Sequence, residues 1–265
     1  MPDLLEAIIG ATKRDLIEAE REVRLSDLEK KAESMTSRGD LFYSSMSAST
    51  SFNVIAECKS SSPSRGVLKH DYRPGLVAKS YEVGGAAAIS VLTEPSFFGG
   101  SLDDLDVVRS AVEIPVLRKD FIISRYQIFQ AVVAGADAIL LIVAALSDKA
   151  LKLLLEEASR VGLAVLVEVH DKKELSRAIE AGAVMIGVNN RNLRTLVVDT
   201  SASYSLIERI PKPVIAIAES GLSTASDLRS LREVGYSGFL IGESLMTADN
   251  PGEKLSGILA ECEVV

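Results

Sequence analysis

The stretch Val54-Ile55-Ala56-Glu57-Cys58-Lys59 is an apolar run that ends in charged residues. Along a β-strand alternate side chains point to the same side, so Glu57 and Lys59 share a side with Ile55, while Cys58 points the other way. An unpaired charge is costly to desolvate, so a buried strand has no reason to end in one. The run predicts a strand whose carboxyl end reaches a polar site, although an internal salt bridge would explain the same pair.

Two later apolar runs end in the same way. Lys119 closes the run 114–119 and has the same parity as Leu117, which means that both side chains point to the same side of the strand. Glu168 closes the run 164–168 and has the same parity as Leu166. In a barrel of parallel strands all carboxyl ends meet on one face, where active sites lie. We expect burial to tune the pKa of Lys119 so that it serves as a general acid, and to raise the pKa of Glu168 so that it serves as a base.

The rest of the chain repeats a strand, a polar loop and a helical stretch. Glycine pairs such as Gly85-Ala86 and Gly235-Tyr236 precede several strands and are typical of helix C-caps. The alternation predicts a (β/α)8 TIM barrel. A doubly wound sheet is the alternative, but the glycine fingerprint expected after its first strand is missing. The predicted strands are 54–58, 87–92, 115–118, 138–142, 164–169, 185–189, 214–218 and 238–241.

Residues 1–51 differ from this pattern and predict an N-terminal helical extension packed on the barrel of residues 52–265, in a single domain overall. Leu4, Leu5, Ile8 and Ile9 fall on one helical face. The first forty or so residues look helical, and the stretch 17–31 is amphipathic and rich in Glu, Arg and Lys. The stretch 35–51 is rich in Ser, Thr, Met and Gly, and we expect a loose connector with room for one short helix.

Composition restricts the classes of partner. The net charge of −8 over 265 residues argues against a nucleic-acid surface, although a few local cations could still hold an anionic small ligand. Cys58 and Cys262 lack metal-like spacing, so we expect no metal, no disulfide and a reducing cytoplasm. The N-terminus does not resemble a signal peptide, and the apolar run 138–146 is too short to span a bilayer. We expect a cytoplasmic monomer with no cofactor, no membrane contact and no fused partner enzyme.

Loops after the remaining strands supply further candidates. The serine-rich loop 60–66 carries Arg65; composition favours an ordinary flexible loop over a lid. Arg191 could clamp an anion or brace Glu168. His170 follows Glu168 by two residues, and we expect a surface histidine because no nucleophile accompanies it. Glycine-containing turns after the last two strands are places where such barrels hold phosphate, where Glu243 would be unfavourable unless its side chain turns away.

Together these runs resemble the indole-3-glycerol-phosphate synthase family from the N-terminal extension to the last strand. The order of the Lys-Asp-Phe and Asn-x-Arg-x-Leu runs is quite specific. Position 192 is Asn where Asp is common in the family. The matching segments are Ile55-Ala56-Glu57-Cys58-Lys59, Ser90-Val91-Leu92-Thr93-Glu94, Pro115-Val116-Leu117-Arg118-Lys119-Asp120-Phe121, Val167-Glu168-Val169-His170, Ile186-Gly187-Val188-Asn189-Asn190-Arg191-Asn192-Leu193, Ala218-Glu219-Ser220-Gly221 and Leu240-Ile241-Gly242-Glu243-Ser244.

The resemblance implies a carboxy-lyase of tryptophan biosynthesis. It would convert 1-(2-carboxyphenylamino)-1-deoxyribulose 5-phosphate to indole-3-glycerol phosphate, CO2 and water. It implies Lys119 as general acid and Lys59 as the group that holds the anthranilate carboxylate and can be the acid for the dehydration. It implies Glu168 as base or as stabiliser of the cationic intermediate. Glu57 and Asn189 would position these groups. The implied substrate-binding residues are Ser62, Phe98, Phe121, Ile142 and Arg191, and the implied phosphate-binding residues are Ser220, Gly221, Gly242 and Glu243.

Two other functions fit a barrel with strand-end lysines. A Schiff-base aldolase would use Lys119 as a nucleophile that forms an imine with a carbonyl substrate. A non-catalytic barrel that binds a phosphosugar would leave the set of Lys and Glu residues unexplained. Trapping with sodium borohydride separates a Schiff-base aldolase from an enzyme that only transfers protons. Turnover of a substrate excludes the non-catalytic barrel.

Overall fold

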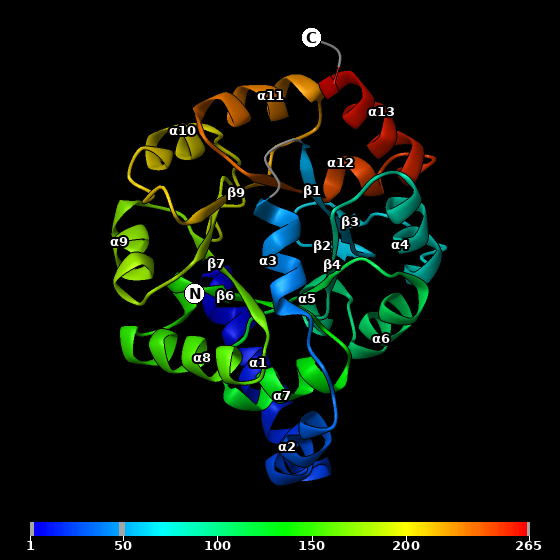
Figure 1. Cartoon of the computed structure of the whole chain (residues 1–265). Coiled ribbons are helices and arrows are strands. Elements are labelled where there is room, and N and C mark those ends of the chain that lie inside the picture. The colour runs from blue at the N-terminus through cyan, green and yellow to red at the C-terminus, as the bar shows by residue number, and fades with distance from the viewer. Residues whose placement is uncertain (1–2, 48–50, 264–265) are drawn as a thin grey trace.

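A computed structural model describes residues 3–47 and 51–263 of the chain. Eight parallel strands close into a barrel in the order β1-β10-β9-β8-β7-β6-β5-β4, with helices around it (Figure 1). The predicted (β/α)8 barrel is thus confirmed, and every predicted strand is present with its ends shifted by no more than one residue. The strands are β1 (Asn53–Cys58), β4 (Ala88–Leu92), β5 (Val116–Lys119), β6 (Ala138–Ile142), β7 (Ala164–Val169), β8 (Met185–Asn189), β9 (Ile215–Glu219) and β10 (Gly238–Ile241).

Helices follow the strands and cover the outside of the barrel. The turn glycines before four strands, Gly85, Gly135, Gly182 and Gly235, all have positive φ, as expected for residues that end helices. A two-stranded hairpin, β2 (Ser61–Ser62) with β3 (Gly66–Val67), follows β1. The helices are α4 (Pro74–Val83), α5 (Pro95–Phe98), α6 (Leu102–Ala111), α7 (Arg125–Val133), η1 (Val143–Ala145), α8 (Asp148–Arg160), α9 (Lys172–Glu180), α10 (Ser201–Ile207), α11 (Ala225–Val234), α12 (Glu243–Met246) and α13 (Pro251–Glu263).

The strands bury apolar side chains on both faces, which separates two cores. Ile55, Leu117 and Leu166 belong to the cluster inside the barrel, and Cys58 belongs to the cluster between the sheet and the helices. This confirms the predicted parity of β1, β5 and β7. Charged residues two positions further along each strand must then point inward as well, toward the carboxyl end of the barrel.

The N-terminal segment forms three helices, α1 (Leu4–Glu22), α2 (Leu25–Glu33) and α3 (Gly39–Ser47). The helical character expected of this segment is confirmed, and the amphipathic stretch 17–31 is divided between α1 and α2, because the chain becomes extended at Val23 and Arg24. The expected short helix of the connector is α3, while residues 48–50 of that connector lie outside the described residues. The division of the chain at residue 51 stays a prediction.

Helices α1 and α3 pack against opposite ends of the barrel interior. Leu5 and Ile8 of α1 line the cavity at the carboxyl ends of the strands. Phe42 and Met46 of α3 are fully buried in the same interior cluster, and α3 crosses the near end of the barrel in Figure 1. The interior is therefore closed below by α3 and bordered above by α1.

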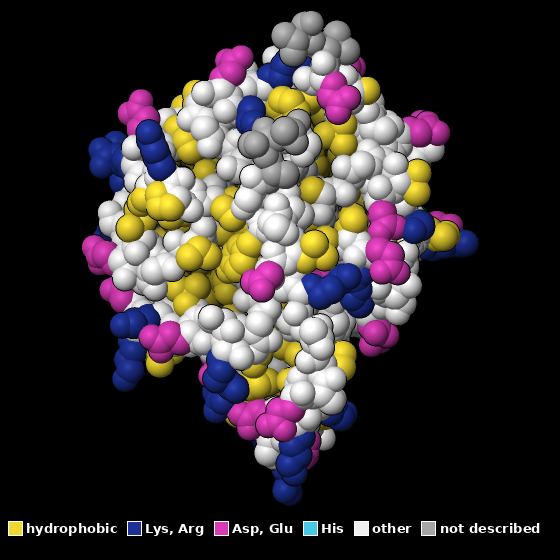
Figure 2. Space-filling view, viewed as in Figure 1, with side chains coloured by type: hydrophobic (Ala, Val, Ile, Leu, Met, Phe, Trp, Pro, Cys, Tyr) yellow, Lys and Arg dark blue, Asp and Glu magenta, His cyan; other side chains and the backbone are white. Residues whose placement is uncertain are grey.

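The end of the barrel that α3 covers carries mixed charges around its rim, with hydrophobic side chains gathered beside that helix (Figure 2). A second, smaller cavity of about 240 Å³ lies there between α3, α8 and neighbouring strand ends, with Tyr43, Leu155 and Val184 in its lining. The hydroxyl of Tyr43 accepts a hydrogen bond from the backbone N–H of Val165 at 2.9 Å, which ties α3 to the start of β7.

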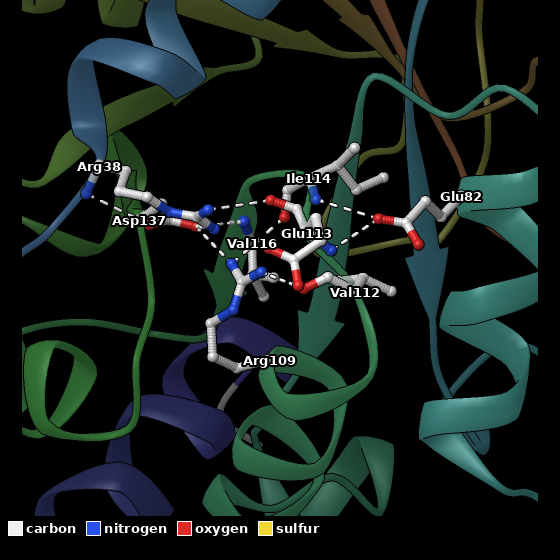
Figure 3. Close-up of polar contacts among 8 residues, drawn as sticks. All are labelled: Arg38, Glu82, Arg109, Val112, Glu113, Ile114, Val116 and Asp137. Atoms are coloured by element: carbon white, nitrogen blue, oxygen red, sulfur yellow. Dashed lines mark hydrogen bonds and ion pairs between the residues drawn. The ribbon is translucent and has the colours of Figure 1, made fainter.

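Asp137 joins α3 to the bottom of the barrel (Figure 3). Its carboxylate accepts hydrogen bonds from the Arg38 guanidinium at 3.1 Å, from Arg109 at 2.8 Å and from the backbone N–H of Val116 at 2.9 Å. Arg38 and Arg109 also donate to backbone carbonyls of the segment 112–114 before β5. One buried carboxylate thus links the N-terminal extension, α6 and two strand starts.

Candidate active site

A cavity of about 750 Å³ opens at the carboxyl ends of the strands. Every residue that the sequence proposed for the site lines it. The structure therefore brings together side chains and turns from seven strands, the hairpin β2–β3 and α5. These residues are Glu57, Lys59, Ser62, Phe98, Lys119, Phe121, Ile142, Glu168, Asn189, Arg191, Ser220, Gly221, Gly242 and Glu243.

Glu57 is the centre of a chain of ion pairs at the floor of the cavity. Its Oε1 lies 2.5 Å from Lys59 Nζ and its Oε2 lies 3.1 Å from Lys119 Nζ. Burial alone would raise the pKa of Glu57, but the Lys119 and Lys59 ammonium groups outweigh it and lower that pKa to about 2. Glu57 therefore stays ionised and holds the two lysines on either side of it.

The pKa of Lys119 corrects the sequence-based expectation. Burial lowers this pKa, as expected, but the carboxylates of Glu57, Glu219 and Glu168 raise it above its ordinary value. Opposite charges nearby favour the charged form of a group and here exceed the effect of desolvation. Lys119 is thus an ammonium at neutral pH, able to donate a proton.

Glu168 and His170 also differ from expectation. Burial would raise the pKa of Glu168, yet its contact with His170, together with Lys119 and Asn189, lowers it. His170 is not a surface residue: its Nε2 lies 3.2 Å from Glu168 Oε1. The raised pKa predicted for Glu168 was wrong because a cation from the next turn of chain lies against it.

Glu219 is a site residue that the sequence analysis missed. It is completely buried, and its Oε2 lies 3.7 Å from Lys119 Nζ. Burial and the neighbouring charges of Glu168 and Glu57 raise its pKa to about 8. The signal was present, since Glu219 has the parity of Ile217, but the predicted strand ended one residue too early.

The fold leaves space for these inward carboxylates at two glycines. A Cβ at Gly187 would lie 1.9 Å from Glu219 Oε1, and a Cβ at Gly242 would lie 2.2 Å from Glu57 Oε1. Real Cβ atoms do not approach an oxygen so closely, so a side chain at either glycine would displace the carboxylate from its present position.

Glu219 predicts a dependence of stability on pH. The folded state holds its proton up to about pH 8, whereas the ordinary pKa is 4.5. A raised folded pKa contributes stability that is complete below the unfolded pKa and is lost as pH rises through the folded one, with a slope of at most about 1.4 kcal/mol per pH unit. Relative to Glu219→Gln, the wild-type chain should therefore lose stability between about pH 5 and 9.

Chemical denaturation of both chains across this pH range measures the difference. Glu208→Gln, at an exposed position on the outside of the barrel, is the matched control and should follow the wild type. A constant difference between wild type and Glu219→Gln at all pH values would contradict the raised pKa.

Two arginines meet at Glu243, in the turn after β10. Arg65 Nε lies 2.9 Å from its Oε1 and Arg191 Nη2 lies 3.1 Å from its Oε2. The side chain of Glu243 thus turns to the guanidinium groups. Arg191 pairs with Glu243, so the expectation that Arg191 braces Glu168 was wrong. Arg65 comes from the loop 60–66, which therefore contacts the turn after the neighbouring strand β10.

An apolar slot lines the part of the cavity formed by the residues that follow β4 and β5 and end β6. The rings of Phe98 and Phe121 lie 6.1 Å apart between centroids, and Ile142 lines the same cavity. Phe98 is held in place because Glu94 caps α5 and accepts hydrogen bonds from the backbone N–H groups of residues 96–98. A flat aromatic group fits between walls of this kind.

No group of three or more His, Cys, Asp or Glu residues is arranged to hold a metal ion within 3–47 and 51–263. Over the same ranges, no helix has both the length and the apolar character needed to cross a membrane.

Fold and site together define a class: a (β/α)8-barrel enzyme with an acid–base site for an anionic small molecule. The family model for indole-3-glycerol phosphate synthase matches residues 5–257. The chain belongs to the indole-3-glycerol phosphate synthase family, and it is a carboxy-lyase of tryptophan biosynthesis.

Relatives with this function are similar over nearly the whole chain. The indole-3-glycerol phosphate synthase of Sulfurimonas denitrificans is 47% identical over 249 residues, which cover 93% of this chain and 95% of the relative. That of Koribacter versatilis is 46% identical over 259 residues, 98% of this chain and 100% of the relative. Among solved structures, a thiamine phosphate pyrophosphorylase from Pyrococcus furiosus aligns with a TM-score of 0.59 at 16% identity, covering 80% of this chain and 97% of that one, and shows the shared barrel.

Proposed function

We propose that Lys119 is the general acid that protonates the ketone oxygen of 1-(2-carboxyphenylamino)-1-deoxyribulose 5-phosphate while the aromatic carbon attacks. The observation that carries this role is the position of its ammonium between Glu57 and Glu219, at 3.1 and 3.7 Å. An acid must carry its proton when the substrate arrives, and the ionised carboxylates of Glu57 and Glu168 keep Lys119 charged.

Lys59 binds the carboxylate of the anthranilate ring in this proposal and can supply the proton for the final loss of water. Its Nζ lies on the far side of Glu57 from Lys119, so the two lysines address different groups of one substrate. Glu57 and Asn189 act as positioning residues. Asn189 Oδ1 accepts a hydrogen bond from the backbone N–H of Arg191 at 2.9 Å, which fixes the orientation of its amide.

Glu168 is the proposed base and the stabiliser of the cationic intermediate. Its lowered pKa supports an ionised carboxylate at neutral pH, which suits both tasks. After ring closure, loss of CO2 restores the aromatic ring. A proton then passes from carbon to Glu168 and the hydroxyl leaves as water, which completes the indole.

The phosphate is proposed to lie between the turns Ser220-Gly221 and Gly242-Glu243, with Arg191 beside it. Ser220 and Gly221 both have positive φ, 65° and 79°, which is uncommon for a serine and indicates a turn shaped for close approach of a ligand. Glu243 tolerates the anion because Arg65 and Arg191 neutralise its charge. Phe98, Phe121 and Ile142 enclose the ring, and Ser62 lies beside it. Anchoring both anionic ends bends the substrate and brings its reacting carbons together.

The raised pKa of Lys119 argues against the Schiff-base aldolase, because imine formation needs a neutral amine. Treatment with sodium borohydride and a keto-sugar phosphate should therefore leave Lys119 unmodified.

Incubation with the anilino-ribulose phosphate, followed by indole fluorescence, tests the function directly. We expect indole-3-glycerol phosphate and CO2 to form in equal amounts without any added metal or cofactor. Absence of turnover with this substrate would reject the proposed roles as a whole.

We further propose that the chain acts as a monomer in the cytoplasm. The site residues of one chain complete the cavity, which supports a working monomer. Both cysteines, Cys58 and Cys262, are free thiols and buried, which suits a reducing compartment.

A further inference from the structure

A line of three side chains runs from the cavity toward solvent behind the proposed base. Glu168 Oε1 lies 3.2 Å from His170 Nε2, and His170 Nδ1 lies 3.0 Å from Glu174 Oε2. The exposed fraction of the side chain rises along the line, from 2% for Glu168 to 15% for His170 and 17% for Glu174. His170 is absent from the lining of the cavity, so it approaches Glu168 from the side away from a substrate.

The start of α9 places Glu174 against the histidine. Asp171 caps this helix, and its Oδ1 accepts hydrogen bonds from the backbone N–H groups of Lys173 and Glu174 at 2.8 and 2.9 Å. Glu174 turns back, and its Oε2 accepts both the backbone N–H of His170, at 2.8 Å, and the contact with the ring. A helix-capping arrangement thereby also fixes the plane of the imidazole.

The charges around His170 favour an imidazolium. Glu168 and Glu174 flank the ring directly, Lys119 acts on Glu168 from β5, and Glu219 on β9 interacts with Glu168 and His170 only once it ionises, near pH 8. Burial lowers the pKa of His170, but the two flanking carboxylates outweigh this effect and raise it to about 10. At neutral pH the charged ring then pairs with both carboxylates, with Glu174 through the hydrogen bond at Nδ1 and with Glu168 through the ion pair at Nε2.

We propose that His170, held by Glu174, is a positioning residue that keeps Glu168 ionised and fixes its orientation toward the substrate. The inference rests on the proposed role of Glu168. It assigns a task to two residues outside the cavity, which act on the reaction only through Glu168.

Three variants test this assignment. His170→Gln keeps a hydrogen-bond donor but cannot carry a charge, and His170→Leu has neither a donor nor a charge. Glu174→Gln keeps the imidazole ring but replaces the carboxylate that binds it. For folded His170→Gln we expect kcat at pH 7 to fall about tenfold while KM stays within about twofold. We also expect the acidic limb of the kcat profile to move up by about one pH unit, because Glu168 loses a neighbouring cation. His170→Leu should show a larger shift, and Glu174→Gln a smaller shift in the same direction.

The chain has two histidines, which offers an internal control. His70 is exposed and lies outside the cavity lining, so His70→Gln should keep the wild-type profile. In protein labelled with ¹⁵N-histidine, the ring nitrogens of His170 should titrate at higher pH in the wild type than in Glu174→Gln. This readout needs no turnover.

The outcomes separate this inference from the proposed function. If the wild type fails to turn over the anilino-ribulose phosphate, the proposed function fails, whatever the histidine spectra show. If the wild type is active but folded His170→Gln keeps its kcat and acidic limb, only the role of His170 is overturned. Should both His170 variants fail to fold, an unchanged pH profile and an unchanged His170 titration in Glu174→Gln overturn it equally.

Discussion

Lys119→Met should lower kcat by about 10²–10⁴, because a positioned general acid contributes about that factor. Methionine has nearly the same length but carries no proton to give. The chain should still fold, since Glu57 keeps its 2.5 Å contact with Lys59 and Glu219 can remain protonated. Single-turnover kinetics with the anilino-ribulose phosphate measures the chemical step separately from substrate binding.

Lys152→Met is a suitable control, because Lys152 lies exposed on α8 outside the cavity. It should keep the kcat of the wild type. Thermal unfolding of both variants shows whether a loss of rate reflects chemistry or folding. Wild-type turnover by a folded Lys119→Met variant would reject Lys119 as the acid.

Asp137→Ala should lower the free energy of unfolding by about 3–5 kcal/mol, the range for removing one partner of a buried ion pair. The Asp137 side chain is only 4% exposed, and it accepts from Arg38, Arg109 and the N–H of Val116. Removal leaves the largely buried Arg109 guanidinium without its carboxylate and detaches α3 from the barrel start. Urea unfolding monitored by circular dichroism measures this loss.

Asp71→Ala supplies the matched comparison. Asp71 forms an ion pair with Arg73 at 3.0 Å, but its side chain is 77% exposed, so its loss should cost less than about 1 kcal/mol. Because Asp137 lies at the end of the barrel opposite the cavity, kcat of Asp137→Ala well below its melting temperature should stay close to wild type. Equal stabilities of the two variants would contradict the structural role of Asp137.

Much of the site could be predicted because strand parity is a local property. The alternation that put Glu57 in line with Ile55 also put Lys119 in line with Leu117 and Glu168 in line with Leu166, and all three line the cavity. The same rule would have found Glu219 had the predicted strand run to its true end. A shift of one residue in a strand boundary was enough to place a buried carboxylate in a loop.

Protonation states could not be predicted, and the errors share a cause. Lys119 and Glu168 were expected to respond to burial; burial does act on both most strongly, but their neighbours together outweigh it and reverse the direction of the pKa shift. The sequence analysis interpreted His170 and Arg191 only from the strands that they follow. Their partners, Glu174 and Glu243, come from the helices that follow β7 and β10.

Sequence by itself determined the eightfold strand pattern, the inward-facing residues of most strands and the family to which the chain belongs, because alternation and motif order depend on neighbours along the chain. Tertiary structure alone decided which carboxylate is protonated, which cation meets which anion and how the bottom of the barrel is held. Those outcomes depend on a few ångströms between atoms from distant strands, and Coulomb energy and desolvation change steeply over such distances.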